Sequence, residues 1–195
     1  MAVKSPARSS LFNQLLYRKM ELPTFRYHPN PVATGACVKQ SETCLSCEKE
    51  VSHIYIGPTF SIHELDEQLC PWCIADGSAN EKFDVEFSDP HPLELAGLPE
   101  SLIEEVTTRT PGFICWQQPT WLTHCDDACL FVGDATMKVL QAISTAEHDD
   151  LLKTGHLDKE EFEEILGYYR PGGTPGIYHF RCMHCDFQRF GIEYP

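Results

Sequence analysis

Two Cys-x-x-Cys pairs frame the segment CLSCEKEVSHIYIGPTFSIHELDEQLCPWC, residues 44–73. Cys44 and Cys47 form the first pair, and Cys70 and Cys73 form the second. Two residues between cysteines let both sulfurs face one tetrahedral ion, and a second pair completes a four-coordinate zinc site. We therefore predict structural zinc on these four cysteines, within a zinc-ribbon-like lobe at about residues 37–80.

The pair Cys70 and Cys73 also has the spacing of a thioredoxin-like redox motif. Such a motif begins a helix directly after a buried strand of a βαβ unit. Here the sequence predicts a strand at 52–56 and a short helix from 62 to 69, opened by a Ser61 capping box, ahead of Cys70. That order favours zinc. The alternatives are free core thiols, redox chemistry and an iron–sulfur cluster.

A third pair, Cys182 and Cys185, needs metal-binding partners from elsewhere in the chain. The best source is His124 and Cys125, and the second predicted zinc site combines these four residues. Cys129 lies four residues after Cys125, so one helix could present both thiols, and Cys129 or His184 could replace His124. Buried free thiols are the alternative interpretation, as expected for Cys37 and Cys115.

The remaining pattern predicts an α+β fold, a small mixed domain with zinc-ribbon-like Cys-x-x-Cys lobes and several short helices. A basic arm, residues 1–20, precedes a single domain, 21–195, whose second metal lobe is formed by about 115–130 and 177–195. Asp158 is expected to cap the last helix. The predicted helices are 100–109, 135–146 and 159–169, and the further strands are 83–87, 177–181 and 187–194.

Charge is distributed unevenly along the chain. The formal net charge is −14, and four of the 15 basic residues precede residue 20, whereas all 29 acidic residues follow it. Residues 21–195 therefore carry a formal charge of −18. This charge disfavours nucleic-acid binding and favours a basic protein partner, although acidity also serves solubility. Without a signal peptide or a long apolar run, we expect a cytoplasmic protein with no stable membrane insertion.

Several motifs together resemble the CbrC family of bacterial proteins. They are LPTFRYHPNPVATGACV, the Cys44/Cys47 pair, YIGP, LCPWCIADGSANEKF, TPGF, WLTHCDDACLF and YHFRCMHC, spread over residues 22–186. The family is largely uncharacterised and is associated with tolerance to colicins. It has alanine more often than cysteine at the place of Cys129, so the resemblance favours His124 and Cys125 in the second site.

These observations lead to a functional hypothesis. We expect a zinc-stabilised immunity or tolerance protein that binds a basic toxin domain through acidic residues near 84–105 and 147–164. Two sites closed by four protein ligands leave no position for a reactive water, so an enzyme is not expected. The alternatives are a metal-dependent enzyme that reverses or prevents toxin damage and a zinc-dependent regulatory module.

Overall fold

The computed structural model describes residues 21–195. This part of the chain is a mixed α+β fold with seven short helices and four small antiparallel sheets, which confirms the predicted class. The predicted arm, residues 1–20, lies outside the described residues, and the division of 21–195 into lobes stays a prediction. Between residues 21 and 195, no helix is both long and apolar enough to cross a bilayer.

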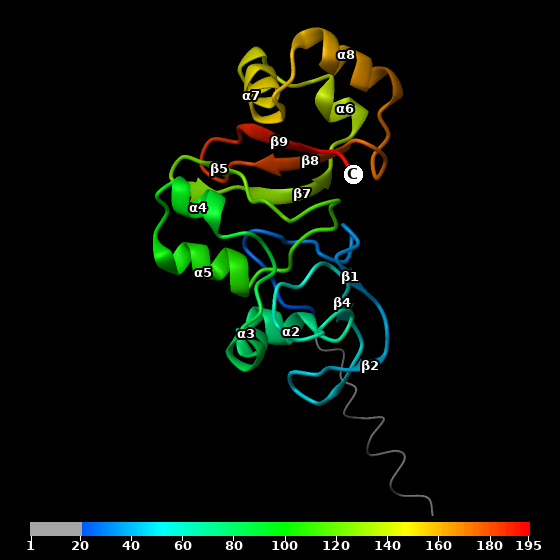
Figure 1. The fold of residues 1–195 in the computed structure, drawn as a ribbon, viewed down its shortest axis with the longest axis vertical. Coiled ribbons are helices and arrows are strands. Elements are labelled where there is room, and N and C mark those ends of the chain that lie inside the picture. The colour runs from blue at the N-terminus through cyan, green and yellow to red at the C-terminus, as the bar shows by residue number, and fades with distance from the viewer. Residues whose placement is uncertain (1–20) are drawn as a thin grey trace, which may run out of the picture.

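Residues 21–87, called the first lobe below for brevity, hold the Cys-x-x-Cys pairs of residues 44–73 and are drawn in blue to green in Figure 1. Two small ribbons, β1–β4 and β2–β3, stand beside two short helices. Their core is built around the thiols of Cys44, Cys70 and Cys73, with Tyr55 and Phe87 packed edge to face at 5.3 Å. The elements are β1 (Cys37–Val38), β2 (Glu42–Thr43), β3 (Glu50–Val51), β4 (Ile54–Tyr55), α2 (Pro71–Ala75) and α3 (Ser78–Phe83).

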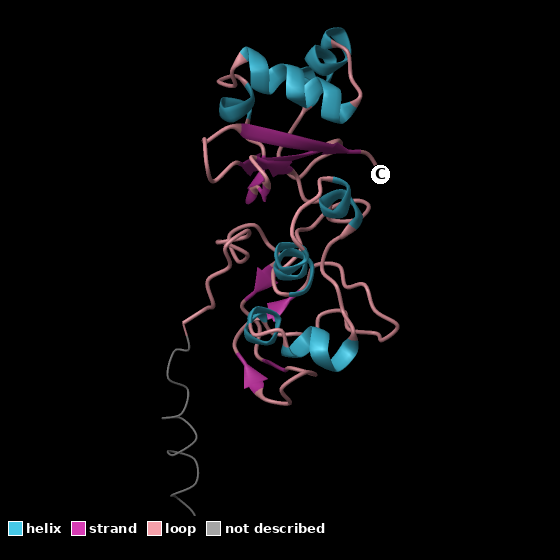
Figure 2. Cartoon of the chain, turned by 90° about the vertical axis from the view of Figure 1, so that its left-hand side faces the viewer, coloured by secondary structure: helices cyan, strands magenta, loops and turns pink. Residues whose placement is uncertain are grey.

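The second half is built on the three-stranded sheet β7-β8-β9. Figures 1 and 2 show α6, α7 and α8 as a layer over one face of this sheet, while α4 and α5 lie on the side of the first lobe. The elements are α4 (His91–Leu95), α5 (Glu100–Thr108), β5 (Thr123–His124), β6 (Asp127–Ala128), β7 (Leu130–Asp134), α6 (Met137–Leu140), α7 (Thr145–Gly155), α8 (Lys159–Tyr168), β8 (Gly176–Arg181) and β9 (Gln188–Glu193).

Alternation along the strands gives each face of this sheet its own core, because successive side chains point to opposite faces. Ile177 and Phe190 pack with Phe162 and other residues of the helical layer. Tyr178 and Phe180 point the other way, into an aromatic cluster with Phe113, Trp121 and Phe131. The sheet therefore separates the core of the helical layer from the aromatic cluster.

Several predicted elements need correction. No helix forms at 62–69, because Glu67 has a φ of +56°, which a continuous helix cannot include. The predicted strand at 83–87 is only a bridge between Glu86 and Phe60. The predicted helix 135–146 is two helices, because Ser144 forms a capping box with Glu147 and begins α7 there. Helices α5 and α8 and strands β8 and β9 match their predictions closely.

Candidate metal centres

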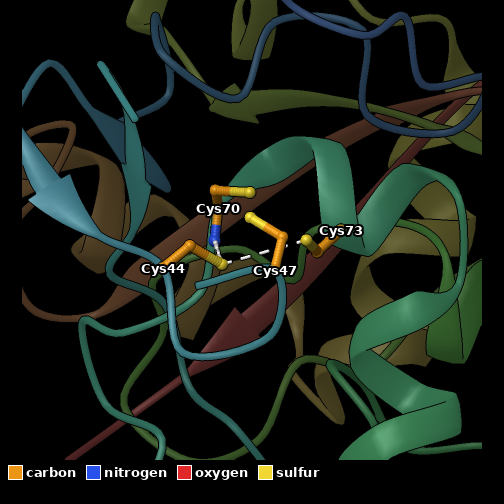
Figure 3. A group of neighbouring side chains, drawn as sticks. All are labelled: Cys44, Cys47, Cys70 and Cys73. Carbon is orange, nitrogen blue, oxygen red and sulfur yellow. Dashed lines mark hydrogen bonds between the residues drawn. The ribbon is translucent and has the colours of Figure 1, made fainter. Parts of the chain in front are cut away.

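The first cluster contains Cys44, Cys47, Cys70 and Cys73, whose sulfur atoms all lie within 4.8 Å of one another. Figure 3 shows the four side chains converging from a turn and from the start of α2. The Sγ atoms of Cys44 and Cys73 are 3.8 Å apart. Four sulfurs bound about 2.3 Å from a tetrahedral zinc ion would lie about 3.8 Å from one another. The cluster therefore has the size of a four-sulfur metal site.

Short-range backbone bonds place the first two thiols. The N–H of Cys44 donates to the carbonyl of Lys49 at 2.9 Å, and the N–H of Glu48 donates to the carbonyl of Cys44 at 2.8 Å. Glu48 has a φ of +57°, which closes the turn tightly after Cys47. The Cys-x-x-Cys segment thus forms a knuckle, a turn that presents both sulfurs on one side.

The second two thiols come from α2. Cys70 is the N-cap residue of this helix, and Pro71 occupies its first position, where a missing N–H costs nothing. Cys73 follows within the first turn, so both sulfurs face the knuckle. The N–H of Cys70 also donates to the Sγ of Cys44 at 3.3 Å, and such a bond stabilises a thiolate.

Lys82 joins α3 to the first knuckle. Its Nζ lies 3.1 Å from the carbonyl oxygens of Leu45 and Ser46 and 3.1 Å from Glu48 Oε1. Two of these acceptors are the residues between Cys44 and Cys47. One ammonium group therefore fixes the turn that carries half of the cluster.

The thiols of this cluster share their protons unequally. Cys44, Cys70 and Cys73 are buried, and Cys47 is half-buried. Hydrogen bonding with Cys70 and Cys73 lowers the pKa of Cys44 well below its usual range, while hydrogen bonding with Cys44 raises the pKa of Cys70. The backbone N–H of Cys70, which donates to Cys44 Sγ, would stabilise a thiolate at that position. A divalent cation would displace the thiol protons and neutralise the charge directly.

The second cluster contains His124, Cys125, Cys182 and Cys185, again with all four donor atoms within 4.8 Å. The Sγ atoms of Cys125 and Cys185 are 3.7 Å apart, and His124 Nδ1 lies 3.2 and 3.4 Å from them. The imidazole of His124 stacks on Phe187 with ring centroids 4.7 Å apart. The structure therefore brings together the eight residues that the sequence predicted as two sets of ligands.

A hairpin, and not a helix, presents His124 and Cys125. Thr123 pairs with Ala128 and His124 pairs with Asp127 across β5 and β6, while Cys125 and Asp126 form the turn with φ values of +52° and +55°. Two positive φ angles define the tight turn that suits the twist of antiparallel strands. This corrects the expectation that one helix presents both Cys125 and Cys129.

Cys129 and His184, the alternative ligands, have other partners. Cys129 is fully buried in the aromatic core, its carbonyl accepts the Trp121 indole N–H at 2.8 Å, and burial raises its pKa to about 12. His184 directs its Nε2 to Asp127 Oδ2 at 2.8 Å, away from the cluster. Neither belongs to the group of four converging donors.

Asp127 supports the second cluster from below, a role that sequence analysis missed. Its side chain is only 6% exposed and accepts bonds from Arg26 at 2.7 Å, Tyr27 at 2.9 Å and His184. These partners lower the pKa of Asp127 although burial alone would raise it. Because two of the donors are about 100 residues distant along the chain, no local motif could have indicated this network.

The knuckle of the first cluster recurs in the second. The N–H of Cys182 donates to the carbonyl of Phe187 at 2.8 Å, as Cys44 does to the residue five positions ahead. Asp186, directly after Cys185, has the same φ of +57° as Glu48. Although burial opposes it, N–H donation from His184 at 3.3 Å helps to lower the pKa of Cys182 to about 6. Two copies of one thiolate-presenting turn thus occur in a chain without an evident sequence repeat.

The fold and its clusters define the class: an α+β protein with two sulfur-rich clusters of four residues, each able to hold a metal ion. The comparison with known sequences then gives the family. A model of UPF0167, an uncharacterised protein family, matches residues 22–194, so the chain belongs to that family.

Its curated relatives are bacterial. A UPF0167 protein of Pseudomonas aeruginosa is 39% identical over 174 residues, which cover 89% of this chain and 97% of that protein. UPF0167 proteins of Mycobacterium bovis and Mycobacterium tuberculosis are each 40% identical over 169 residues, covering 85% of this chain and 89% of theirs. No solved structure matches the chain significantly.

The family match corrects one prediction. The motifs of residues 22–186 were interpreted as a resemblance to the CbrC family, whereas the matching family model and the curated relatives carry the designation UPF0167. The CbrC assignment is therefore not supported, and the association with colicin tolerance that came with it no longer supports a function.

Proposed function

We propose that this protein is a zinc-stabilised binding protein that neutralises a basic protein, a bacterial toxin domain, through its acidic surface. The observation that carries the proposal is the closure of both clusters, combined with the charge of −18 on residues 21–195. Each cluster supplies four protein donors, which fills a tetrahedral coordination shell. Metal bound in this way would stabilise the fold, and the protein's surface would bind the partner.

Zinc is the metal that the donor sets favour. Four thiolates, or three thiolates and an imidazole, are the common ligand sets of structural zinc, and soft sulfur donors disfavour calcium and magnesium. The spacing of 3.7–3.8 Å between sulfurs fits a tetrahedral ion in both clusters. All ten cysteines are free thiols in this structure, so each cluster has its full set of donors.

One acidic patch supports a basic partner. The patch consists of Asp84, Glu86, Asp89 and Glu94, around the loop between α3 and α4. Burial and repulsion by the other three carboxylates raise the pKa of Glu86, so the four charges are close enough to destabilise one another. Within residues 21–195, none of them forms an ion pair with lysine or arginine. A partner's cation would relieve this repulsion and would speed association at low salt.

The test is binding to a toxin encoded beside the gene. The protein and the toxin domain are purified separately, and their association rate is measured between 50 and 300 mM salt. We expect tight binding whose association rate falls steeply with salt, and we expect loss of toxin activity at equimolar protein. Protection of cells without physical binding would overturn the proposal, because neutralisation would then be indirect.

A charge-matched pair of variants locates the surface. Changing the four carboxylates of the patch to amides should slow association at least tenfold, because rim charges act mainly on the association rate. The control makes the same change at four exposed glutamates outside both predicted contact regions, Glu21, Glu42, Glu64 and Glu67. Equal losses in both variants would indicate that only net charge matters and that the patch is not the contact surface.

A further inference from the structure

A cavity of about 440 Å³ lies on the opposite side of β7 and β8 from the helical layer, outside both cysteine clusters. Its walls come from five parts of the chain: Thr34, the 114–116 segment, β7, the 172–173 loop and β8. Binding sites for small molecules typically have volumes of about 300–1,000 Å³. The cavity is therefore large enough for a compact organic group.

A bulge in β7 turns a carboxylate into this cavity. Phe131 pairs with Phe180, but Asp134 pairs with Tyr178, so three residues of β7 span two of β8. The extra residue shifts the alternation, and Asp134 lies on the same face as Phe131 and Tyr178 instead of the opposite one. Gly133, at a φ of +128°, makes the bulge possible.

Asp134 has no cationic partner among residues 21–195. None of the ion pairs in this part of the chain includes it, and its neighbour at the cavity wall is Gly172, whose N–H faces the carboxylate. A Cβ built on Gly172 would lie 3.8 Å from Asp134 Oδ2, an ordinary van der Waals contact, so the φ of +73° and not the space favours glycine there. Burial raises the pKa of Asp134 and the Gly172 N–H lowers it, and the side chain stays exposed to a molecule in the cavity.

The other walls are aromatic and apolar. Trp116 is 52% exposed and Ile114 is 48% exposed, whereas Tyr178 and Phe131 are buried behind them. The Trp116 backbone N–H donates to Glu193 Oε2 at 3.2 Å, which fixes this segment against β9. An exposed indole and an exposed isoleucine in the same cavity as a carboxylate suit a ligand that carries an ammonium group on an apolar stem.

The cavity offers no activated nucleophile. Its one thiol, Cys115, is half-buried, and burial raises its pKa to about 12, so it stays protonated at neutral pH. Burial likewise raises the pKa of Tyr178, which keeps its phenol neutral. Asp134 is therefore the side chain that supplies negative charge to the lining, and the arrangement suits binding and not catalysis.

We propose that this cavity binds an organic cation: an ammonium group on an apolar stem, with the charge on Asp134 and the stem against Trp116 and Ile114. The chemistry is the same for a free amine and for a lysine side chain of another protein. The site is independent of the proposed toxin binding, because it lies in a different part of the molecule from the acidic patch.

The test compares a cation with its neutral isostere on the full-length protein. Binding of 3-phenylpropylammonium and of 3-phenylpropanol is measured by calorimetry and by the NMR shift of the Trp116 indole. We expect the amine to bind at least tenfold more tightly than the alcohol. Asp134→Asn should reduce this ratio to near one, while Glu163→Gln, which removes the same charge from an exposed helix face, should leave it unchanged.

Further measurements distinguish a free amine from a protein lysine as the ligand and check that each variant is folded. Tighter binding of N-acetyl-lysine amide than of the free amine identifies a protein side chain, and the reverse order identifies a small molecule. Trp116→Ala should weaken amine and alcohol alike, and unchanged urea unfolding of each variant shows that the fold persists. No binding of any probe at 10 mM, equal binding of amine and alcohol, or an unchanged ratio in Asp134→Asn would each overturn the proposal.

Discussion

Loss of one cysteine ligand is expected to cost one metal ion and leave the other in place. A structural zinc site contributes on the order of 10 kcal/mol at neutral pH. Each of four ligands then accounts for about 3 kcal/mol, roughly a hundredfold in the dissociation constant. Because the donors of each cluster lie within 4.8 Å of one another and belong to separate groups, the two sites should respond independently.

The assay is elemental analysis after dialysis against a competing chelator. We expect two zinc ions per chain in the unaltered protein and one in Cys73→Ser and in Cys182→Ser. Cys129→Ala is the matched control, because this buried thiol borders the second cluster without joining it. It should keep both ions although the lost sulfur destabilises the core by about 1–2 kcal/mol.

The two variants should also differ in folding. Cys73 lies in the buried core of the first lobe, so Cys73→Ser should lower the urea midpoint and reduce the helical circular dichroism. A purified protein without metal, two ions retained in both serine variants, or an ion lost in Cys129→Ala would refute the reasoning from cluster geometry.

Three further changes test single side chains. Burial lowers the pKa of His28 to about 4. Between pH 6.5 and 4 the imidazole is therefore protonated in the unfolded chain but stays neutral in the folded chain. The free energy of unfolding should fall by about 3 kcal/mol over this window. His28→Gln should remove that part of the pH slope in urea unfolding. Asp127→Ala should cost about 2 kcal/mol at pH 7, since it leaves the buried Tyr27 hydroxyl unpaired and removes the partner of the half-exposed Arg26 and His184. An exposed control, Asp149→Ala, should cost under about 0.5 kcal/mol. Asp158→Ala should lower the free energy of unfolding by about 1 kcal/mol, because the Asp158 carboxylate caps α8. An unchanged urea midpoint would show that this cap does not stabilise the fold.

The sequence predicted the residues of the candidate metal centres more completely than it predicted the helices and strands around them. Spacing of two between cysteines limits how far apart the sulfurs can lie, so Cys182 and Cys185 already indicated a shared ion. The sequence left Cys129 and His184 open as alternatives to His124, and the structure places His124 with Cys125, Cys182 and Cys185. The capping box at Asp158 was also readable, because its bonds are local.

What could not be predicted was backbone geometry without a residue signature. Glu67 and Cys125 adopt positive φ angles that glycine, asparagine or aspartate usually provide, and nothing in their identity indicates this. Ser61 accepts the N–H of His63 at 3.2 Å as a cap would, but the following residues turn back to place Cys70 beside Cys44. The contacts that join Cys70 to Cys44 therefore outweighed the local tendency of residues 62–69 to form a helix.

The two clusters differ in how deeply they lie. Three of the four thiols of the first are buried, whereas Cys125 and Cys185 of the second are exposed. Chelators in solution could reach an ion in the second cluster at Cys125 and Cys185, whereas release of an ion from the first cluster would require its buried core to open. When metal is scarce, the chain should therefore pass through a long-lived form that keeps an ion in the first cluster and has lost the ion of the second.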